Sequence, residues 1–550
     1  MQKDPIQEGI SRLISEALEN LKKEFASLDT SAIQIHLEVP KDRAHGDLFT
    51  NVAMRLASLL KQKPLDIAGR LSSELESSLG AGKLTALIKK VEVKAPGFIN
   101  FWLSDEALCA MLKDIAGLKQ DFGKNNIGQG KKVLVEFVSA NPTGPLTIAH
   151  ARQAAFGDSL SKIMTHCGYA VKKEYYINDE GVQMSLLAES VKARYMELHN
   201  KKYAFPENGY KGAYIYDIAK DIKEELTDKE FFLKFSCEWI MKGIKKDLDD
   251  FNVGFDSWYS QAALAKSGKI EKALALLKEK GYIYENEGAS WLKSTDFGDE
   301  KDRVVIKSDS SYTYLAPDIA YHRDKFGRGF EKLIDIWGPD HHGYIPRIKA
   351  AVTALGFPKD SLSVIIIQLA TLFRDGKPVS MSTRQGEFVT LREMLDEVGK
   401  DAGRFMFLMR KADSHLDFDL ELAKKHTAQN PVYYVQYAHA RICSILEKQK
   451  PAAAAKTSLT LLREREEVDF IRILSQFPYV VKMCGIGLEP LGLVSYLQEL
   501  AGAFHYFYDK HRVISDDADI TNARLFLVNC AKIVLANGLT LLGVSAPEKM

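Results

Sequence analysis

The stretch from Lys132 to Asp158, KVLVEFVSANPTGPLTIAHARQAAFGD, constrains the fold more than any other part of the chain. Its first part, Val133–Val138, is apolar and rich in β-branched residues, which is typical of a buried strand in a parallel sheet. A turn at Asn141–Gly144 follows. Pro145 then suits the first position of a helix, because a first-turn N–H has no intrahelical partner. The sequence therefore predicts a strand that ends at a tight turn and leads directly into a helix.

Such a turn is suited to binding an anion. Backbone N–H groups at a helix N-terminus point toward the turn, and the helix dipole favours negative charge there. Thr147 and His150 are three residues apart, so their side chains share one face of the first helical turns. From these residues alone, a phosphate site and an ordinary strand–turn–helix with a surface histidine are equally good interpretations.

The composition is that of a soluble globular protein. The chain has 550 residues, of which 27% are charged, and this length is enough for about three domains. A formal net charge of +1 argues against a nonspecific nucleic-acid-binding protein but allows local basic patches. The six cysteines form no Cys-x-x-Cys pair, which favours a reducing cytoplasm. We find no signal peptide and no apolar run near the ~20 residues of a membrane-spanning helix.

The pattern of apolar residues divides the chain into three parts. Residues 1–120 mix helical and strand patterns, which predicts an α+β domain. From 121 to 405 strands alternate with helices, which predicts a parallel sheet covered on both faces, with a largely helical insertion at about 187–294. Residues 406–550 show helical patterns only, so an all-α domain is expected there.

Strands are predicted in the first two parts. The first part has Ile33–Val39, Val91–Val93 and Gly97–Phe101; the second has, besides Val133–Val138, the runs Val171–Ile177, Arg303–Lys307, Leu333–Trp337 and Val364–Ile367. Open parallel sheets bind ligands at the carboxyl ends of their strands, where the strand order reverses. Three polar turns follow predicted strands, at Asn141–Gly144, Tyr314–Asp318 and Gly338–Gly343. We therefore expect these three turns to meet at one ligand site.

The phrase NPTGPLTIAH resembles the HIGH signature of class I aminoacyl-tRNA synthetases, and its flanks resemble those of bacterial-type arginyl-tRNA synthetases. That family usually has a histidine at each end of the tetrad. Here the tetrad runs from Thr147 to His150, and only the final histidine is kept. Further phrases resemble the same family along the whole chain: HGDLFTNVA, APGFINF, YINDEG, YVQYAHARI, FHYFYDKHRV and LLGVSAPEKM.

The resemblance implies an arginine–tRNA ligase with a Rossmann-like catalytic domain, an N-terminal domain that binds tRNA and a helical anticodon-binding domain. Such an enzyme activates L-arginine with ATP, which carries Mg²⁺, to arginyl-adenylate. It then transfers the arginyl group to the 3′ end of arginine tRNA and releases AMP and pyrophosphate. We expect a cytoplasmic monomer with no tightly bound protein metal. The alternatives are a catalytically weakened paralogue that binds tRNA and another class I synthetase, such as the cysteinyl enzyme.

The resemblance also implies the residues that bind ATP. His150 would donate to the phosphates, with Thr147 beside it, and the other contacts would come from Gly144, Asp340, Met381 and Ser382. The loop FRDGKPVSMSTRQG resembles the KMSKS loop, with Ser380 in place of its first lysine and Arg384 in place of its second. The cation for pyrophosphate would then be Arg384 or Lys377. The alternative is a plain surface loop that contains glycine.

An arginine site needs carboxylates, since the guanidinium is planar and permanently charged. The resemblance assigns Tyr314 and Asp318 to the substrate and gives its amino and carboxylate end to Ser139 and Asn141. Glu136 and His341 are further candidates. Taken alone, Asp318 is equally explained as a carboxylate favoured in the first turn of a helix.

Residues that contact tRNA are expected in the last part of the chain. Tyr437 and Arg441 are four residues apart on one predicted helix, so they share a face. We expect the tyrosine to stack on an unpaired base of the anticodon loop and the arginine to contact a phosphate or base edge. The alternative is that Tyr437 lies in the core and Arg441 caps a neighbouring helix.

Overall fold

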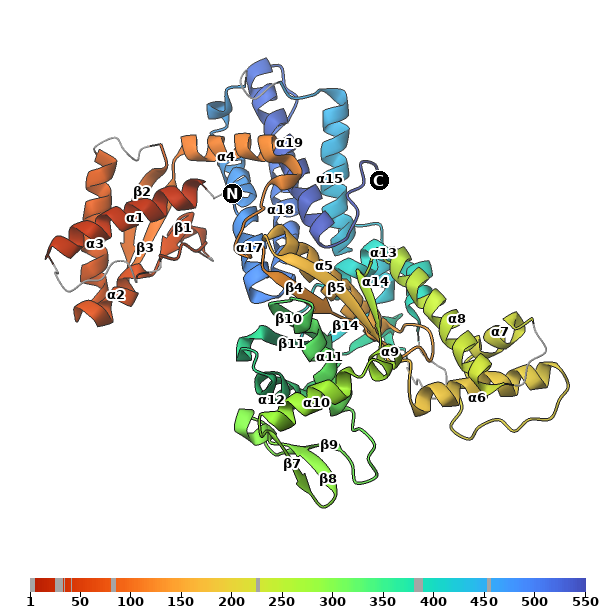
Figure 1. Ribbon diagram of the computed structural model, residues 1–550. Helices are drawn as coiled ribbons and strands as arrows, with labels where there is room; N and C mark the ends of the chain where they lie inside the picture. Colours follow the sequence, from red (N-terminus) through yellow and green to blue (C-terminus); the bar gives the residue numbers. More distant parts are fainter. Residues whose placement is uncertain are drawn as a thin grey trace.

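The computed structural model describes residues 5–24, 33, 35–40, 42–80, 86–223, 228–379, 389–452 and 457–550. A five-stranded parallel sheet lies at its centre (Figure 1). Its strands, in the order in which they lie side by side, are β11 (Leu362–Ile366), β10 (Lys332–Trp337), β4 (Lys132–Glu136), β5 (Ala170–Ile177) and β6 (Ser257–Ser260). The chain runs outward from β4 to β6 and then outward from β10 to β11. The strand order therefore reverses between β4 and β10, as expected of a sheet with a ligand crevice there.

Both faces of the sheet are covered, as predicted. Val133 and Val135 of β4 belong to the core that includes α5 (Ile148–His166). Leu134 lies between them and points to the opposite face, where it belongs to the core formed with α11 (Leu315–Gly327) and α12 (Ile345–Leu355). Because successive side chains of a strand point to opposite faces, a strand covered on both sides needs apolar side chains toward both, and Val133, Leu134 and Val135 supply them.

Helix α5 begins later than the sequence predicts. Its first residue is Ile148 and its N-cap is Thr147, so Pro145 precedes the helix. The backbone just before Ile148 pairs with another segment: the Leu391 N–H donates to the Leu146 carbonyl at 2.7 Å, and Thr147 forms an antiparallel bridge with Thr390. These pairings hold the chain extended after the proline and delay the helix.

The strand predicted at Arg303–Lys307 is β9 (Arg303–Ile306), but it does not join the central sheet. It forms a separate antiparallel sheet with β8 (Ala289–Leu292) and β7 (Ile283–Asn286). Only Val305 of β9 is fully buried. A strand buried on one side suits a small antiparallel sheet better than a parallel sheet covered on both faces.

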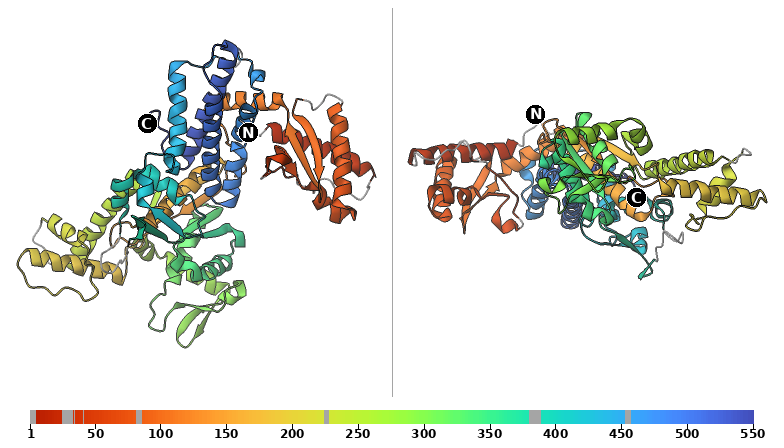
Figure 2. Two further views of the ribbon diagram at one scale, coloured as in Figure 1. Left: turned by 180° about the vertical axis from the view of Figure 1, so that it is seen from behind. Right: turned by 60° about the horizontal axis from the view of Figure 1, so that its bottom comes forward.

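The span expected to be a helical insertion is helical in most of its length. Helices α6 (Val182–Leu198), α7 (Tyr214–Asp221) and α8 (Lys229–Asp250) project away from the sheet, and Figure 2 shows the same projection from behind. The span also contributes β6 as an edge strand of the sheet, followed by α9 (Gln261–Lys266) and α10 (Lys269–Glu279).

The N-terminal part is an α+β unit. A three-stranded antiparallel sheet, β1 (Leu48–Thr50), β3 (Phe98–Leu103) and β2 (Ile88–Lys94), is accompanied by α1 (Pro5–Glu24), α2 (Val52–Leu60), α3 (Pro64–Gly80) and α4 (Asp105–Leu118). The strand predicted at Ile33–Val39 is wrong in the residues described there. Only Glu38 forms a bridge, with Phe49, because the neighbouring strand β1 is three residues long and offers little edge for pairing.

Helix α13 (Leu391–Phe407) leads into the C-terminal part, which is mostly helical, with α14 (Leu420–Lys424), α15 (Pro431–Lys448), α16 (Arg465–Ser475), α17 (Phe477–Gly487), α18 (Leu491–Lys510) and α19 (Ala518–Leu541). The prediction of helices alone is wrong at β14 (Leu416–Asp419). This strand pairs with β12 (Ala370–Arg374), which also pairs with β13 (Lys377–Pro378). Helix α19 is long and apolar enough to span a membrane, but 67% of its most apolar 18-residue stretch is buried within the protein, as in a core helix.

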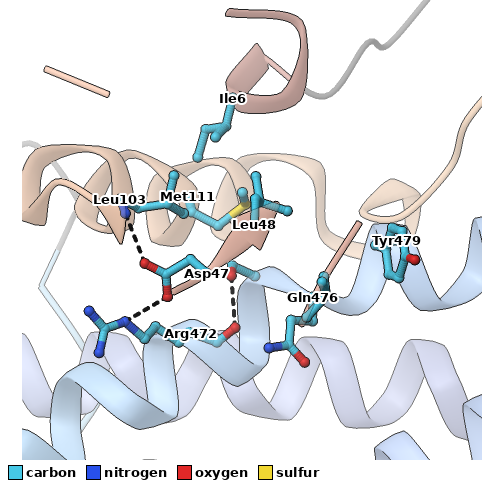
Figure 3. Close-up of a pocket in the computed structure, with 10 residues that line it drawn as sticks. Ile6, Asp47, Leu48, Leu103, Met111, Arg472, Gln476 and Tyr479 are labelled. Carbon is cyan, nitrogen blue, oxygen red and sulfur yellow. Dashed lines mark hydrogen bonds and ion pairs between the residues drawn. The ribbon is translucent and has the colours of Figure 1, made fainter. Parts of the chain in front are cut away.

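The N-terminal unit contacts the helical part through an ion pair. Asp47 accepts a hydrogen bond from the Leu103 N–H at 2.8 Å, and its other oxygen lies 2.8 Å from Nε of Arg472 on α16 (Figure 3). Met111 of α4 and Leu48 line the same small cavity. This contact links the two outer parts of the molecule directly, on the side of α4.

Candidate active site

A carboxylate lies on each of the two strands at the point where the strand order reverses. Glu136 of β4 and Asp335 of β10 are paired in register, and they are 6% and 1% exposed. A buried carboxylate is strongly destabilising unless other groups compensate its charge. Its neighbours therefore show what this part of the sheet is built to hold.

Lys325 of α11 lies between the two carboxylates. Its Nζ is 2.6 Å from Glu136 Oε2 and 2.8 Å from Asp335 Oδ1, and its side chain is 0% exposed. Burial opposes the charge of this lysine, but Asp335 and Glu136 outweigh the burial and raise its pKa. Lys325 is therefore a permanent cation shared by two strands.

His322 supplies a second cation one helical turn earlier. Its Nδ1 lies 2.8 Å from the backbone carbonyl oxygen of Asp318, and its Nε2 lies 2.8 Å from Asp335 Oδ2. A carbonyl oxygen and an ionised carboxylate can only accept, so both ring nitrogens must carry hydrogen. Asp335 is ionised because Lys325 and His322 outweigh its burial and lower its pKa.

Asp318 has a different kind of partner. The hydroxyl of Tyr344 donates to its Oδ2 at 2.6 Å. Among the residues that the structure describes, no cation contacts this carboxylate and no group bonds its Oδ1. Burial raises the pKa of Asp318, and the bond from Tyr344 is the largest influence that opposes the rise. We call Glu136, Asp318, Asp335, His322 and Lys325 the Asp318 cluster; it contains three carboxylates and two cations.

The turn after β4 presents further polar groups toward the same crevice. Val138 and Ser139 have φ angles of 69° and 41°, in the left-handed region that non-glycine residues rarely adopt. The Ser139 hydroxyl donates to Glu136 Oε1 at 2.9 Å and accepts from the Tyr176 N–H at 3.1 Å. The Asn141 amide donates to Gln183 Oε1 at 2.7 Å. The unusual backbone thus aims a serine back at a buried carboxylate.

His150 is held in one tautomer. Its Nδ1 accepts from the Thr147 N–H at 3.1 Å, and the Thr147 hydroxyl lies 3.1 Å from the same nitrogen. Burial lowers the pKa of His150 to about 4, against a smaller opposite influence of Asp340. A neutral imidazole that accepts at Nδ1 carries its hydrogen on Nε2. His150 is therefore a neutral donor, and it can polarise an anionic group without a change in protonation.

The other predicted ATP residues lie around this helix start. Gly144 packs against Tyr214, whose ring carbon Cζ is 3.3 Å from the position a Cβ would take, and the Tyr214 hydroxyl donates to the Thr143 carbonyl. Asp340 and His341 are exposed on the turn after β10, where His341 Nε2 lies 3.4 Å from Asp340 Oδ2. Lys377 is exposed on β13. Met381, Ser382 and Arg384, and also Ser380, lie outside the described residues.

Tyr314 and the tRNA candidates are also exposed. Tyr314, the N-cap of α11, is 82% exposed, whereas Asp318 faces the cluster. On α15, Tyr437 stacks against Tyr433 and against His505 of α18, at centroid distances of 6.0 and 5.9 Å. Arg441 donates to the Tyr508 hydroxyl at 3.1 Å.

Sequence reasoning missed His322, Lys325, Asp335 and Tyr344. Asp335 interrupts an apolar strand as Glu136 does, so a charge inside a buried strand could have identified it. His322 and Lys325 follow Asp318 at helical spacing on α11. No cluster of three or more His, Cys, Asp or Glu side chains is arranged to hold a metal ion in the described part of the chain.

Comparison with known proteins identifies the family. Models for the arginyl-tRNA synthetase N-terminal domain, the class I (R) tRNA synthetase catalytic domain and the DALR anticodon-binding domain match residues 8–103, 114–444 and 435–550. The chain is 48% identical over 531 residues to the arginine–tRNA ligase of Citrifermentans bemidjiense, covering 94% of this chain and 95% of that protein. The chain belongs to the arginyl-tRNA synthetases. It is an ATP-dependent arginine–tRNA ligase of class I, and nothing in these matches supports a weakened, tRNA-binding paralogue.

Two further matches extend over the full length. The arginine–tRNA ligase of Listeria monocytogenes is 46% identical over 559 residues, with 99% of this chain and 100% of that protein covered. In fold, the chain matches the Thermus thermophilus arginyl-tRNA synthetase with a TM-score of 0.78, at 22% identity and with 98% and 99% of the two chains covered. The Rossmann-like α/β sheet, the N-terminal α+β unit and the helical C-terminal part are thus those of a class I synthetase of this family.

Proposed function

We propose that L-arginine is activated between the Asp318 cluster and the turn after β4, and that the product is transferred to the 3′ end of arginine tRNA. The arginine carboxylate attacks the α-phosphorus of ATP, which forms arginyl-adenylate and expels pyrophosphate. A terminal ribose hydroxyl of the tRNA then attacks the adenylate carbonyl and releases AMP. The observation that carries the proposal is the Asp318 carboxylate, which has a neutral partner in Tyr344 and a raised pKa.

The guanidinium would bind Asp318 at its Oδ1, because a half-buried carboxylate in excess over the nearby cations attracts a permanent cation. Tyr314 would cover the guanidinium from the solvent side. Ser139 and Asn141 would hold the amino and carboxylate end, and His341 would approach the same end. Glu136 already pairs with Lys325, so its proposed part is to hold Ser139 and to add negative potential for the substrate.

ATP would bind at the start of α5. The Nε2–H of His150, with its position set by Thr147, suits a phosphate oxygen on which charge develops. Gly144, whose missing side chain leaves room for Tyr214, would hold the turn beside the nucleotide, and Asp340 would contact its sugar or base end. Mg²⁺ would enter with ATP on the phosphates. The loop FRDGKPVSMSTRQG would supply the remaining phosphate contacts, from Lys377, Met381, Ser382 and Arg384. Of these four, only Lys377 is among the described residues.

We further propose three domains, residues 1–120, 121–405 and 406–550, of which the outer two bind tRNA. Tyr437 is exposed and stacks on the half-buried Tyr433 and His505, and this aromatic surface, with Arg441 on the same helix, would meet unpaired bases. We also propose a monomer in the cytoplasm; the six cysteines are free thiols, which fits a reducing compartment.

One assay tests the function and another tests the ATP site. With total tRNA, ATP and each amino acid in turn, the enzyme should charge tRNA with arginine alone; charging with a different amino acid would overturn the proposal. In His150→Ala, kcat for adenylate formation should fall roughly a hundredfold or more, as when one transition-state donor is removed. His415→Ala is a matched control, because His415 is exposed beside Asp417 on β14. A full rate in His150→Ala would exclude the assigned donor.

A further inference from the structure

Tyr344 joins the two halves of the proposed active site. It is the last residue of the turn Pro339–Tyr344, which carries Asp340 and His341, and it is the N-cap of α12. Its hydroxyl reaches back to Asp318 on α11. One side chain therefore connects the turn assigned to ATP with the carboxylate assigned to arginine.

The ring of Tyr344 is held in place from two sides. Trp337, the last residue of β10, lies 6.1 Å away between ring centroids, and the Arg347 guanidinium lies 4.8 Å above the ring. Burial, and then the charge of Asp318, raise the pKa of Tyr344, so its hydroxyl keeps its hydrogen throughout the working pH range. The hydroxyl can therefore only act as a donor toward Asp318.

The neutral hydroxyl of Tyr344 stabilises the Asp318 carboxylate without cancelling its negative charge, whereas a cation in the same place would cancel it. The hydroxyl stabilises the ionised carboxylate and fixes its rotamer, since hydrogen bonds to the charged form favour that form. It adds no positive charge, however, so the negative charge stays available to a substrate. Glu136 and Asp335, in contrast, each contact Lys325. Replacement of the hydroxyl by a cation would cancel the charge that Asp318 offers.

We propose that Tyr344 is a positioning residue for arginine: its hydroxyl holds Asp318 ionised and oriented, with Oδ1 directed at the substrate guanidinium. This inference rests on the proposed function, in which Asp318 binds the guanidinium. It predicts that Tyr344 sets the affinity and selectivity for arginine over a neutral isostere of the same shape, such as citrulline. It also predicts that Tyr344 acts only through Asp318.

The experiment is steady-state aminoacylation by Tyr344→Phe, with arginine and ATP varied separately and citrulline as inhibitor. KM for arginine should rise about tenfold or more, which is the cost of a lost hydrogen bond to a charged group. KM for ATP should stay within about twofold, and the ratio of citrulline to arginine affinity should increase. Tyr312→Phe is the matched control, because Tyr312 also donates to a carboxylate, Glu271, at 2.9 Å but lies outside the site.

A double-mutant cycle separates this inference from the proposed function. In the background of Asp318→Asn, the further change Tyr344→Phe should leave KM for arginine unaltered, since the two residues act as a unit. If Tyr344→Phe matches the control, or raises both KM values equally, the positioning role is wrong while the function stands. If Asp318→Asn itself has normal arginine kinetics, the proposed arginine site is wrong. Thermal unfolding of each variant shows whether the fold is intact.

Discussion

Two groups of charged side chains lie in the catalytic part of the molecule, and they differ in the sign of their excess charge. The Asp318 cluster has three carboxylates and two cations. The second group, which we call the Asp158 cluster, consists of Asp158 on α5 with three cations around it. Arg404 and Lys162 lie 2.7 Å from Oδ2 of Asp158, and Lys173 lies 2.9 Å from its Oδ1.

The balance is reflected in the pKa of the carboxylates. At Asp158 burial alone would favour the proton, but Arg404 and the two lysines outweigh it and lower the pKa to about 2. At Asp318 and Glu136 burial is the dominant influence, and both pKa values are raised. The first carboxylate is thus saturated with partners, whereas the second cluster has negative charge in excess.

The residues around each cluster are consistent with this difference in charge balance. Arg404 also donates to the Leu542 carbonyl, at 2.9 Å, and to the Phe251 carbonyl, at 3.2 Å. The Asp158 cluster thus fastens α5 to the C-terminal segment and to the end of α8, away from the crevice. The Asp318 cluster lies where the strand order reverses and contains a carboxylate oxygen with no bond among the described residues. A saturated cluster holds the fold together, and an unsaturated one at such a position is ready for a cationic ligand.

The largest expected effect is on stability, at the saturated cluster. Asp158→Asn leaves the buried Arg404 guanidinium without its carboxylate, and such a loss costs about 3–5 kcal/mol in the free energy of unfolding. KM for arginine in the protein that remains folded should not change. Urea denaturation measures the first quantity and steady-state charging the second. A stable variant with a raised KM for arginine would reverse the assignment of the two clusters.

Asp318→Asn should show the opposite pattern. Loss of the guanidinium partner should cost about 2–5 kcal/mol in kcat/KM for arginine, while KM for ATP barely changes. The free energy of unfolding should stay constant or increase, because the change removes one of the excess negative charges. The same two measurements apply. Normal arginine kinetics would favour the simpler interpretation that Asp318 only stabilises the first turn of α11.

The sequence predicted part of the Asp318 cluster and none of the Asp158 cluster. Glu136 was proposed as a further carboxylate because it lies inside the strand that leads to the site, and His150 and Asp318 were proposed because their motifs resemble those of a family. Such patterns are local, as are the four strands of the central sheet that were predicted, β4, β5, β10 and β11, and the long helices; β6 was not predicted as a strand. A motif also places a residue near a ligand without showing what the residue bonds, and the tautomer of His150 became clear only from its contact with Thr147.

The features that the sequence analysis missed or predicted wrongly depend on contacts between segments that are distant in the sequence. Tyr344 reaches Asp318 across 26 positions of sequence, and no spacing rule connects a turn tyrosine with a helix carboxylate. Strand β9 was assigned to the wrong sheet, because four residues of β pattern do not reveal their partner. The late start of α5 depends on pairing with Thr390 and Leu391, more than 240 residues later in the chain. In each case tertiary pairing overrode a local preference.

The clusters should also respond differently to acid. Asp318 has a raised pKa, so its protonation on acidification removes the charge that we propose binds arginine and at the same time stabilises the fold. KM for arginine should therefore rise as the pH falls through that pKa toward the ordinary value of 3.8, by about tenfold per pH unit below it. Asp158 has a lowered pKa, so its stabilisation is complete above 3.8 and is lost only as the pH falls to about 2.

The measurement is KM for arginine against pH, with Asp318→Asn as the control. The variant has no carboxylate to titrate at this position, so its KM should lack the acid rise that depends on Asp318. A rise of equal steepness in the variant would mean that another group, such as Glu136, controls the pH dependence. Fluorescence of the folded state over the same range would reveal any unfolding in this window.

The smallest expected effect tests whether the Asp158 cluster is truly saturated. Burial, and then the repulsion from Arg404 and Lys173, lower the pKa of Lys162 in spite of its contact with Asp158. A lysine whose pKa is lower in the folded state than in the unfolded chain is less favourable for folding when it is protonated, so the charge of Lys162 does not stabilise the fold at neutral pH. Its side chain is also 30% exposed, and water can replace it. Lys162→Met should therefore change the free energy of unfolding by no more than about 1 kcal/mol.

The comparison variant is Asp158→Asn, measured in the same urea titration. If Lys162→Met costs as much as the loss of Asp158, all three cations are required, and the cluster holds no surplus of positive charge.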